Sequence, residues 1–83
     1  MKKIIIYTTT ICPYCDRAKA LLKRKNLSFE EINVEDENTR NLMVQKANGR
    51  KTVPQIFIGD YHVGGCDDLY SLEQNNKLDE LII

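Results

Sequence analysis

The chain has 83 residues, which is enough for one domain and too few for two. Apolar residues make up 42% and charged residues 29%, a balance typical of globular proteins and not of disordered ones. Twelve basic side chains match twelve acidic ones, so the net charge indicates neither a nucleic-acid partner nor an anionic membrane. No apolar run is long enough for a transmembrane helix or a signal-peptide core, so we expect one domain over residues 1–83, acting as a monomer in the cytosol.

The N-terminal part predicts a strand, a loop and a helix. Lys2 to Tyr7 is a short run rich in β-branched residues, the pattern of a buried strand, and residues 8–11 form the loop. From Tyr14 to about Lys25, apolar residues recur at helical spacing. Basic residues gather at the end of this helix, where its dipole favours cations, and Asn26 is a suitable left-handed residue to end it.

Residues Phe29 to Val34 predict a second strand, with Phe29, Ile32 and Val34 facing inward. A strand, a helix and a strand within this length predict a right-handed crossover that leaves the two strands parallel. The acidic stretch 35–38 then predicts the start of a second helix, which ends at Asn48-Gly49.

A hairpin is predicted after Pro54, since proline can open a strand but cannot sit in its centre. The first strand of this hairpin is Gln55–Ile58 and the second is Tyr61–Val63. Gly59-Asp60 between them is a two-residue turn signal.

Two helices follow the glycine pair Gly64-Gly65. Asp67 and Asp68 are candidate caps for a helix that continues to Glu73, and residues 78–82 predict a short terminal helix. The element order predicts an α/β protein with one mixed sheet of four strands, two of them parallel and two in a hairpin, flanked by helices on both faces.

Two cysteines, Cys12 and Cys15, lie three positions apart where the first helix is expected to begin. At this spacing they lie one helical turn apart on the same face, and their sulfurs can form a disulfide with little backbone movement. Pro13 suits the first turn of a helix, where its missing N–H costs nothing. In a reducing cytosol such a pair is catalytic or metal-binding more often than structural, and the odd total of three cysteines argues against a pure disulfide framework.

The start of a helix favours a reactive sulfur on Cys12, which we expect to be exposed. A helix N-terminus stabilises an anion by about 0.3 to 2 kcal/mol, which lowers the pKa of a thiol by roughly 0.2 to 1.5 units from about 8.5. Free N–H groups of the first turn can add hydrogen bonds to the sulfur. We therefore assign Cys12 as the nucleophile and Cys15, which faces the core, as the resolving thiol.

Metal binding is the competing interpretation of the cysteines. Cys12, Cys15, His62 and Cys66 include the ligand types of a tetrahedral zinc site. A glycine pair separates His62 from Cys66, however, and nothing in the sequence brings His62 near Cys12. We therefore predict no metal site and interpret His62 as an exposed strand residue.

Three motifs together resemble those of dithiol glutaredoxins of the small bacterial type. These motifs are Cys12-Pro13-Tyr14-Cys15, Thr52-Val53-Pro54-Gln55 and Gly64-Gly65-Cys66-Asp67-Asp68, and the resemblance extends over essentially the whole chain. It implies a thioredoxin-like fold and a glutathione-dependent thiol–disulfide oxidoreductase that reduces protein disulfides and glutathione mixed disulfides. Glutathione would be the reductant, no cofactor would be bound, and the partners would be glutathionylated or disulfide-containing proteins.

The resemblance also implies roles for individual residues. Cys12 would attack the protein-side sulfur of a glutathionylated substrate, or one sulfur of a disulfide, and then a second glutathione or Cys15 would resolve the mixed disulfide. The residues expected around glutathione are Tyr14, Arg40, Thr52, Val53, Pro54, Gly65, Cys66 and Asp67.

Four of these residues have a specific expected contact with glutathione. The Val53 backbone would pair with its cysteinyl part like an added strand, beside a cis Pro54. The amides of Cys66 and Asp67 suit the γ-glutamyl carboxylate, and the Asp67 carboxylate suits the ammonium group. Arg40 would reach the glycine carboxylate.

The chain departs from the family pattern at residues 8–10, which are threonines. Many family members carry there a lysine that would bind a glutathione carboxylate and favour the Cys12 thiolate. Three other functions stay open at this point. They are an iron–sulfur carrier with glutathione as co-ligand, which the stiff turn at Pro13 disfavours, a thioredoxin-like reductase served by a flavoprotein, and a non-enzymatic binding module.

Overall fold

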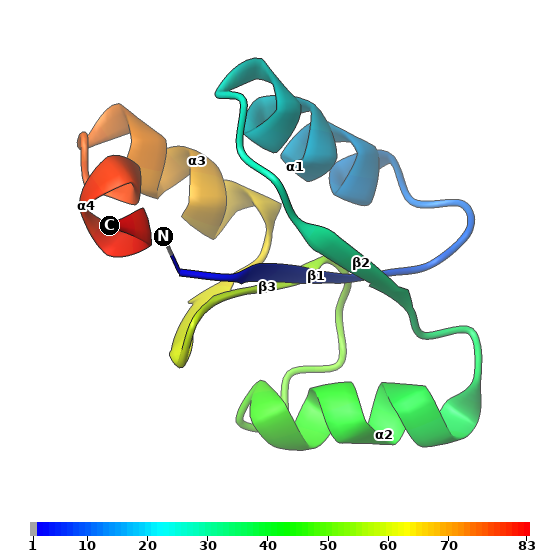
Figure 1. The fold of residues 1–83 in the computed structure, drawn as a ribbon. Helices are drawn as coiled ribbons and strands as arrows, with labels where there is room; N and C mark the ends of the chain where they lie inside the picture. The colour runs from blue at the N-terminus through cyan, green and yellow to red at the C-terminus, as the bar shows by residue number, and fades with distance from the viewer. Residues whose placement is uncertain (1) are drawn as a thin grey trace.

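The computed structural model describes residues 2–83, which form four strands and four helices (Figure 1). The strands are β1 (Ile4–Thr8), β2 (Glu30–Asn33), β3 (Gln55–Ile58) and β4 (Tyr61–Gly64). The helices are α1 (Pro13–Arg24), α2 (Glu37–Lys46), α3 (Cys66–Gln74) and α4 (Leu78–Ile82). Within this described part of the chain, no helix has the length and apolar character needed to cross a membrane.

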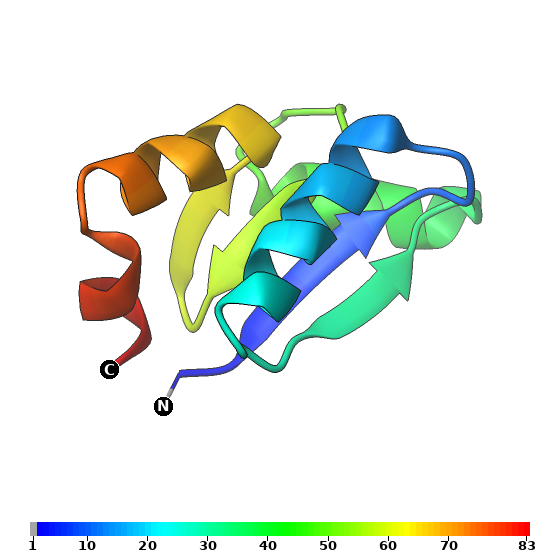
Figure 2. The same cartoon turned by 90° about the horizontal axis from the view of Figure 1, so that it is seen from above.

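The four strands form one mixed sheet in the order β2-β1-β3-β4. β1 is parallel to β2 and antiparallel to β3, and β3 and β4 form the predicted hairpin. Helices α1 and α3 cover one face of the sheet, and α2 covers the other face (Figures 1 and 2). The α/β class and the flanking helices predicted from the sequence are therefore confirmed.

Some element boundaries differ from the predicted ones. β1 begins at Ile4 and continues through Thr8, which the sequence places in the loop. Thr8 is fully buried, and its hydroxyl donates to the Glu31 carboxylate at 2.7 Å, which is why a polar side chain fits at the end of this strand. In β2 the predicted inward residue Val34 is fully buried but lies just after the strand, while Ile32 is only partly buried.

Apolar side chains pack on both faces of the sheet. One cluster lies on the side of α1, α3 and α4, and the α1 residues in it are Ala18, Leu21 and Leu22, each fully buried. The other cluster lies on the side of α2 and contains Tyr7, Val34 and Met43. Full burial of a large aliphatic side chain contributes about 1.5–3 kcal/mol, so these contacts hold α1 firmly against the sheet.

The strand register brings together two segments that are distant in sequence. In the antiparallel pairing of β1 and β3, Tyr7 lies opposite Gln55. The C-terminal end of β1, from which the chain continues to α1, therefore lies beside the N-terminal end of β3, which the chain enters from residues 50–54. This geometry places Cys12 beside Val53, although 41 positions separate them in the chain.

Glu31 ties β1, β2 and α1 together through its carboxylate. Thr8 Oγ1 donates to Glu31 Oε2 at 2.7 Å, and Lys19 Nζ of α1 donates to the same oxygen at 2.9 Å. The hydrogen bond from Thr8, followed by that from Lys19, holds the pKa of Glu31 below its usual range. Because the folded-state pKa is lowered, the ionised carboxylate stabilises the fold above the ordinary carboxyl pKa, and this contribution is lost as the pH falls.

We expect Glu31→Gln to lower the free energy of unfolding by about 0.5–1.5 kcal/mol at neutral pH, because a charged acceptor is lost at a half-exposed position. The difference from the wild type should shrink as the pH falls from 5 to 3. Urea unfolding across this range measures it. Glu30→Gln is the matched control, since Glu30 pairs with the exposed Lys3 side chain at 3.0 Å. An equal loss of unfolding free energy in the two variants at neutral pH would contradict this role of Glu31.

Candidate active site

Cys12 and Cys15 form a disulfide at the start of α1. Cys12 is the N-cap residue, with extended backbone angles, and Pro13 occupies the first helical position. The backbone N–H of Cys15 donates to Cys12 Sγ at 3.1 Å, and the two Cα atoms lie 5.2 Å apart. The cap that is usually an oxygen is here a sulfur, so the first turn of the helix is already arranged to stabilise negative charge on Cys12.

Cys12 is buried, with only 7% of its surface exposed, which corrects the expectation of an exposed thiol. Its sulfur turns inward to accept the Cys15 N–H and to bond Cys15 Sγ, and the Val53 carbonyl oxygen lies 4.0 Å away. Cys15 is buried almost completely, at 1% exposure, as its position on the core side of the helix predicts. Of the pair, Cys12 is thus the sulfur nearer the surface.

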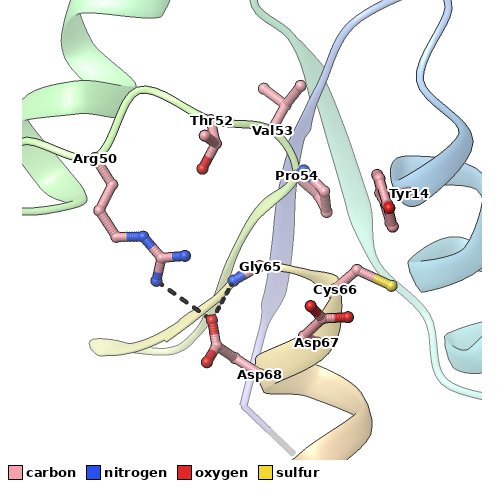
Figure 3. Close-up of a pocket in the computed structure, with 9 residues that line it drawn as sticks. All are labelled: Tyr14, Arg50, Thr52, Val53, Pro54, Gly65, Cys66, Asp67 and Asp68. Carbon is pink, nitrogen blue, oxygen red and sulfur yellow. Dashed lines mark hydrogen bonds and ion pairs between the residues drawn. The ribbon is translucent and has the colours of Figure 1, made fainter.

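A cavity of about 340 Å³ is lined by Tyr14, which lies between the two cysteines, and by Val53, whose carbonyl oxygen lies 4.0 Å from Cys12 Sγ. Neither Cys12 nor Cys15 lines the cavity itself. Its walls come from the start of α1, from the loop before β3 and from the start of α3 (Figure 3). The lining residues are Tyr14, Arg50, Thr52, Val53, Pro54, Gly65, Cys66, Asp67 and Asp68. The Val53–Pro54 peptide bond in this wall is cis, in agreement with the isomer that the resemblance implies.

Seven of the eight residues expected around glutathione line this cavity, and Arg40 does not. Arg40 lies in the first turns of α2, where its Nε donates to the Val34 carbonyl oxygen at 3.4 Å. The structure instead brings Arg50 and Asp68 into the cavity wall, and neither residue was expected there from the sequence. Arg50 could have been found, because it is a basic residue two positions before the Thr52-Val53-Pro54 motif on the same loop.

Asp68, and not Asp67, caps α3. Gly65 is the N-cap residue, and its N–H donates to Asp68 Oδ2 at 2.9 Å, while Arg50 Nη1 donates to the same oxygen at 3.3 Å. The hydrogen bond from the Gly65 N–H is the main cause that holds the pKa of Asp68 below its usual range, and Arg50 adds to it. Asp67 is exposed and is one of the residues that line the cavity.

Cys66 is a free thiol in the cavity wall and is 5% exposed. Burial raises the pKa of Cys66, and the neighbouring Asp67 carboxylate raises it further. A thiol in this setting stays protonated at neutral pH and is a poor nucleophile. The chemistry of the three cysteines is therefore divided, with the reactive pair at α1 and an inert thiol that lines the cavity.

The four residues weighed as zinc ligands in the sequence all lie within residues 2–83. No group of three His, Cys, Asp or Glu side chains there is arranged to hold a metal ion. His62 lies on β4 and bonds Gln55, with its Nε2 2.7 Å from Gln55 Oε1. It is partly buried and not exposed as the sequence analysis expects, because its ring stacks on Phe57.

A cysteine pair at a helix start, facing a cis-proline loop at the edge of a mixed sheet, defines a thiol–disulfide oxidoreductase of the thioredoxin-like fold. The glutaredoxin family model matches residues 4–63. Glutaredoxin 3 of Escherichia coli K12 is 49% identical over 82 residues, which cover 99% of each chain. The chain belongs to the glutaredoxin family.

Two solved structures extend this similarity to three dimensions. The solution structure of glutaredoxin from Brucella melitensis is 55% identical, with a TM-score of 0.87 over 99% of this chain and 89% of that one. The buckwheat glutaredoxin–glutathione complex is 27% identical, with a TM-score of 0.87 over 98% of this chain and 76% of that one. The thioredoxin-like fold and the dithiol redox function expected from the sequence are both confirmed.

The close approach of β4 to α3 requires glycine at position 64. Gly64 has φ of +112°, and a Cβ atom there would collide with the Asp68 carboxylate and the Arg50 guanidinium. We expect Gly64→Ala to lower the free energy of unfolding by about 1–3 kcal/mol, because the backbone angle and the collision both oppose it. Thermal or urea unfolding measures this loss.

Gly65→Ala is the matched control for Gly64→Ala. Gly65 has φ of −98°, and the nearest atom to an added Cβ is the Pro54 carbonyl oxygen at 3.6 Å, an ordinary contact. Its cost should stay near 0.5 kcal/mol, as for an N-cap glycine replaced by alanine. A similar cost at both positions would show that the geometry of Gly64 is not required.

Proposed function

We propose that this chain is a glutathione-dependent reductase of protein disulfides and glutathione mixed disulfides, working as a single domain in the cytosol. The observation that carries the proposal is the cavity beside the Cys12–Cys15 disulfide. It combines a backbone segment at Val53, a guanidinium from Arg50 and the N-terminus of α3 with the Asp67 carboxylate (Figure 3). Glutathione has a peptide centre, two carboxylates and one ammonium group, which is the set of groups that these walls complement.

The cavity suggests one position for each end of the tripeptide. The Val53 backbone, next to the cis bond, supports pairing with the cysteinyl part like an added strand. The amides at the start of α3 suit the γ-glutamyl carboxylate, and the exposed Asp67 suits the ammonium group. Arg50 takes the place proposed for Arg40 and pairs with the glycine carboxylate, because Arg50 lines the cavity and Arg40 lies outside it.

This arrangement favours attack on the sulfur of glutathione, and not on the protein-side sulfur that the resemblance suggests. A glutathionylated substrate whose glutathione lies in the cavity presents that sulfur to Cys12, 4.0 Å from the Val53 carbonyl. The Cys12 thiolate bonds to the glutathione sulfur, the mixed disulfide breaks, and the substrate leaves as a thiolate that takes a proton from water. A second glutathione thiolate then attacks the Cys12-bound sulfur, which releases glutathione disulfide and restores Cys12.

A protein disulfide uses both cysteines. Cys12 attacks one substrate sulfur and becomes joined to the substrate, while the other substrate sulfur leaves as a thiolate. Cys15, whose Cα atom lies 5.2 Å from that of Cys12, then attacks Cys12 Sγ and forms the disulfide seen in the structure. The bond between Cys12 and the substrate breaks in this step, and the second substrate sulfur also leaves as a thiolate. Two glutathione molecules reduce this disulfide and become glutathione disulfide, so the electrons balance.

Replacing each of the two cysteines should have a different effect on the rate of glutathione-dependent reduction of a small mixed disulfide. We expect Cys12→Ser to reduce the rate to background, because a hydroxyl at this position is not ionised and cannot replace the thiolate. Cys15→Ser should keep a rate of the same order as the wild type, since a second glutathione resolves the Cys12-bound sulfur. Activity that survives in Cys12→Ser would overturn the assignment of the nucleophile.

Arg50 and Arg40 form a matched pair for testing the carboxylate contact. We expect Arg50→Met to raise the KM for glutathione about threefold to tenfold, the range for loss of one partly exposed charge-assisted contact. Arg40→Met should leave it nearly unchanged, because this side chain lies outside the cavity. Steady-state rates at varied glutathione measure both values. The reverse result would restore Arg40 as the carboxylate ligand.

A further inference from the structure

The fully buried side chain of Gln55 connects the cavity loop to β4. Gln55 Nε2 donates to the Thr52 carbonyl oxygen at 3.0 Å and to Thr52 Oγ1 at 3.2 Å. On its other side, Gln55 Oε1 lies 2.7 Å from His62 Nε2. The His62 ring is fixed in turn by stacking on Phe57, with the ring centroids 4.7 Å apart. These contacts join the cavity loop, β3 and β4 in one chain of hydrogen bonds.

The donor and the acceptor of each hydrogen bond between Thr52, Gln55 and His62 can be assigned. A carbonyl oxygen can only accept, so the Gln55 amide must turn its nitrogen towards Thr52 and its oxygen towards His62. The His62 Nε2 atom must then carry a hydrogen to donate. Burial lowers the pKa of His62, and the nearby Arg50 guanidinium lowers it further, so the ring is neutral at neutral pH. A neutral ring that donates from Nε2 is the Nε2–H tautomer.

The same bonds determine what Thr52 presents to the cavity. Its Oγ1 accepts from Gln55, so the hydroxyl hydrogen is free to donate in another direction. Figure 3 shows the Thr52 side-chain oxygen directed into the space between Arg50 and Gly65. A donor hydroxyl and a guanidinium at this end of the cavity together favour an acceptor with negative charge.

We propose that Gln55 and His62 are positioning residues that make the Thr52 hydroxyl a donor and so complete, with Arg50, a carboxylate subsite at this end of the cavity. This inference rests on the proposed function, since the carboxylate it would receive is that of glutathione. The two residues touch no ligand and act through Thr52. Both polar atoms of the Gln55 side chain, Nε2 and Oε1, have partners inside the protein, so its amide group has one orientation.

The tautomer of His62 tests the hydrogen bonds from His62 through Gln55 to Thr52 without any ligand. His62 is the single histidine of the chain, so its ring nitrogens give unambiguous NMR signals in uniformly ¹⁵N-labelled protein. At neutral pH the ¹⁵N shifts and couplings should show hydrogen on Nε2 and none on Nδ1. A neutral ring with its hydrogen on Nδ1 and none on Nε2 would overturn the proposal, because Nε2 could then no longer donate to Gln55.

The effect on binding is measured with Gln55→Glu, which keeps the shape of the side chain but removes both N–H groups. We expect the KM for glutathione to rise about threefold to tenfold and kcat to change little, the pattern for a lost binding contact. Thr52→Val should raise the KM similarly, and the double variant should show no further rise, because both changes remove the same donor. Leu81→Ala, a packing change in α4 on the far side of the core, is the control for a general loss of stability and should leave the KM unchanged.

An unchanged KM in Gln55→Glu, or additive rises in the double variant, would overturn the positioning role. The proposed function fails in a different way, through a wild-type rate that does not depend on glutathione. In that case the proposed carboxylate subsite is wrong as well. The His62 tautomer still shows whether His62 donates to Gln55 and Gln55 to Thr52.

Discussion

The hydrogen bond from the Cys15 N–H to Cys12 Sγ is the interaction on which the rest of this structure depends. It makes a sulfur the cap of α1, so the partial positive charge at the helix start falls on the atom that we propose as the nucleophile. The bond holds its geometry only because the helix cannot move, and α1 is fixed by fully buried side chains packed on the sheet. Core packing and reactivity are thus linked, since residues that never meet a substrate keep the Cys12 sulfur in position.

The second requirement is a binding surface at the correct distance from that sulfur, and the sheet supplies it. Because β1 and β3 are neighbours and antiparallel, the end of β1 and the start of β3 lie at one edge. The cis-proline loop therefore faces Cys12, and the start of α3 completes the cavity. Three segments thus meet at one edge, where the Asp68 carboxylate joins the Gly65 amide to Arg50 and the Gln55 side chain supports Thr52.

The sequence predicted the element order, the mixed sheet and the reactive pair because these depend on local patterns and on short motifs. It misplaced features that depend on long-range contacts. Thr8 joins β1 because it pairs with Asn33 of β2 and its carbonyl oxygen accepts from the Val34 N–H at 2.8 Å, and no local pattern contains that information. Cys12 is buried because the distant Val53 loop and its own disulfide enclose it. The sequence favoured Arg40, and only the fold shows that Arg40 bonds the Val34 carbonyl oxygen while Arg50 reaches the cavity.

The most direct measurement is the rate at which reduced Cys12 is alkylated by iodoacetamide as a function of pH, with mass spectrometry to separate it from Cys15 and Cys66. The account predicts that Cys12 reacts much faster at neutral pH than free cysteine does, and that its rate reaches a plateau well below the usual thiol pKa of about 8.5. A rate for Cys12 equal to that of free cysteine, still rising through pH 8.5, would contradict the claim that the start of α1 holds this sulfur as a thiolate.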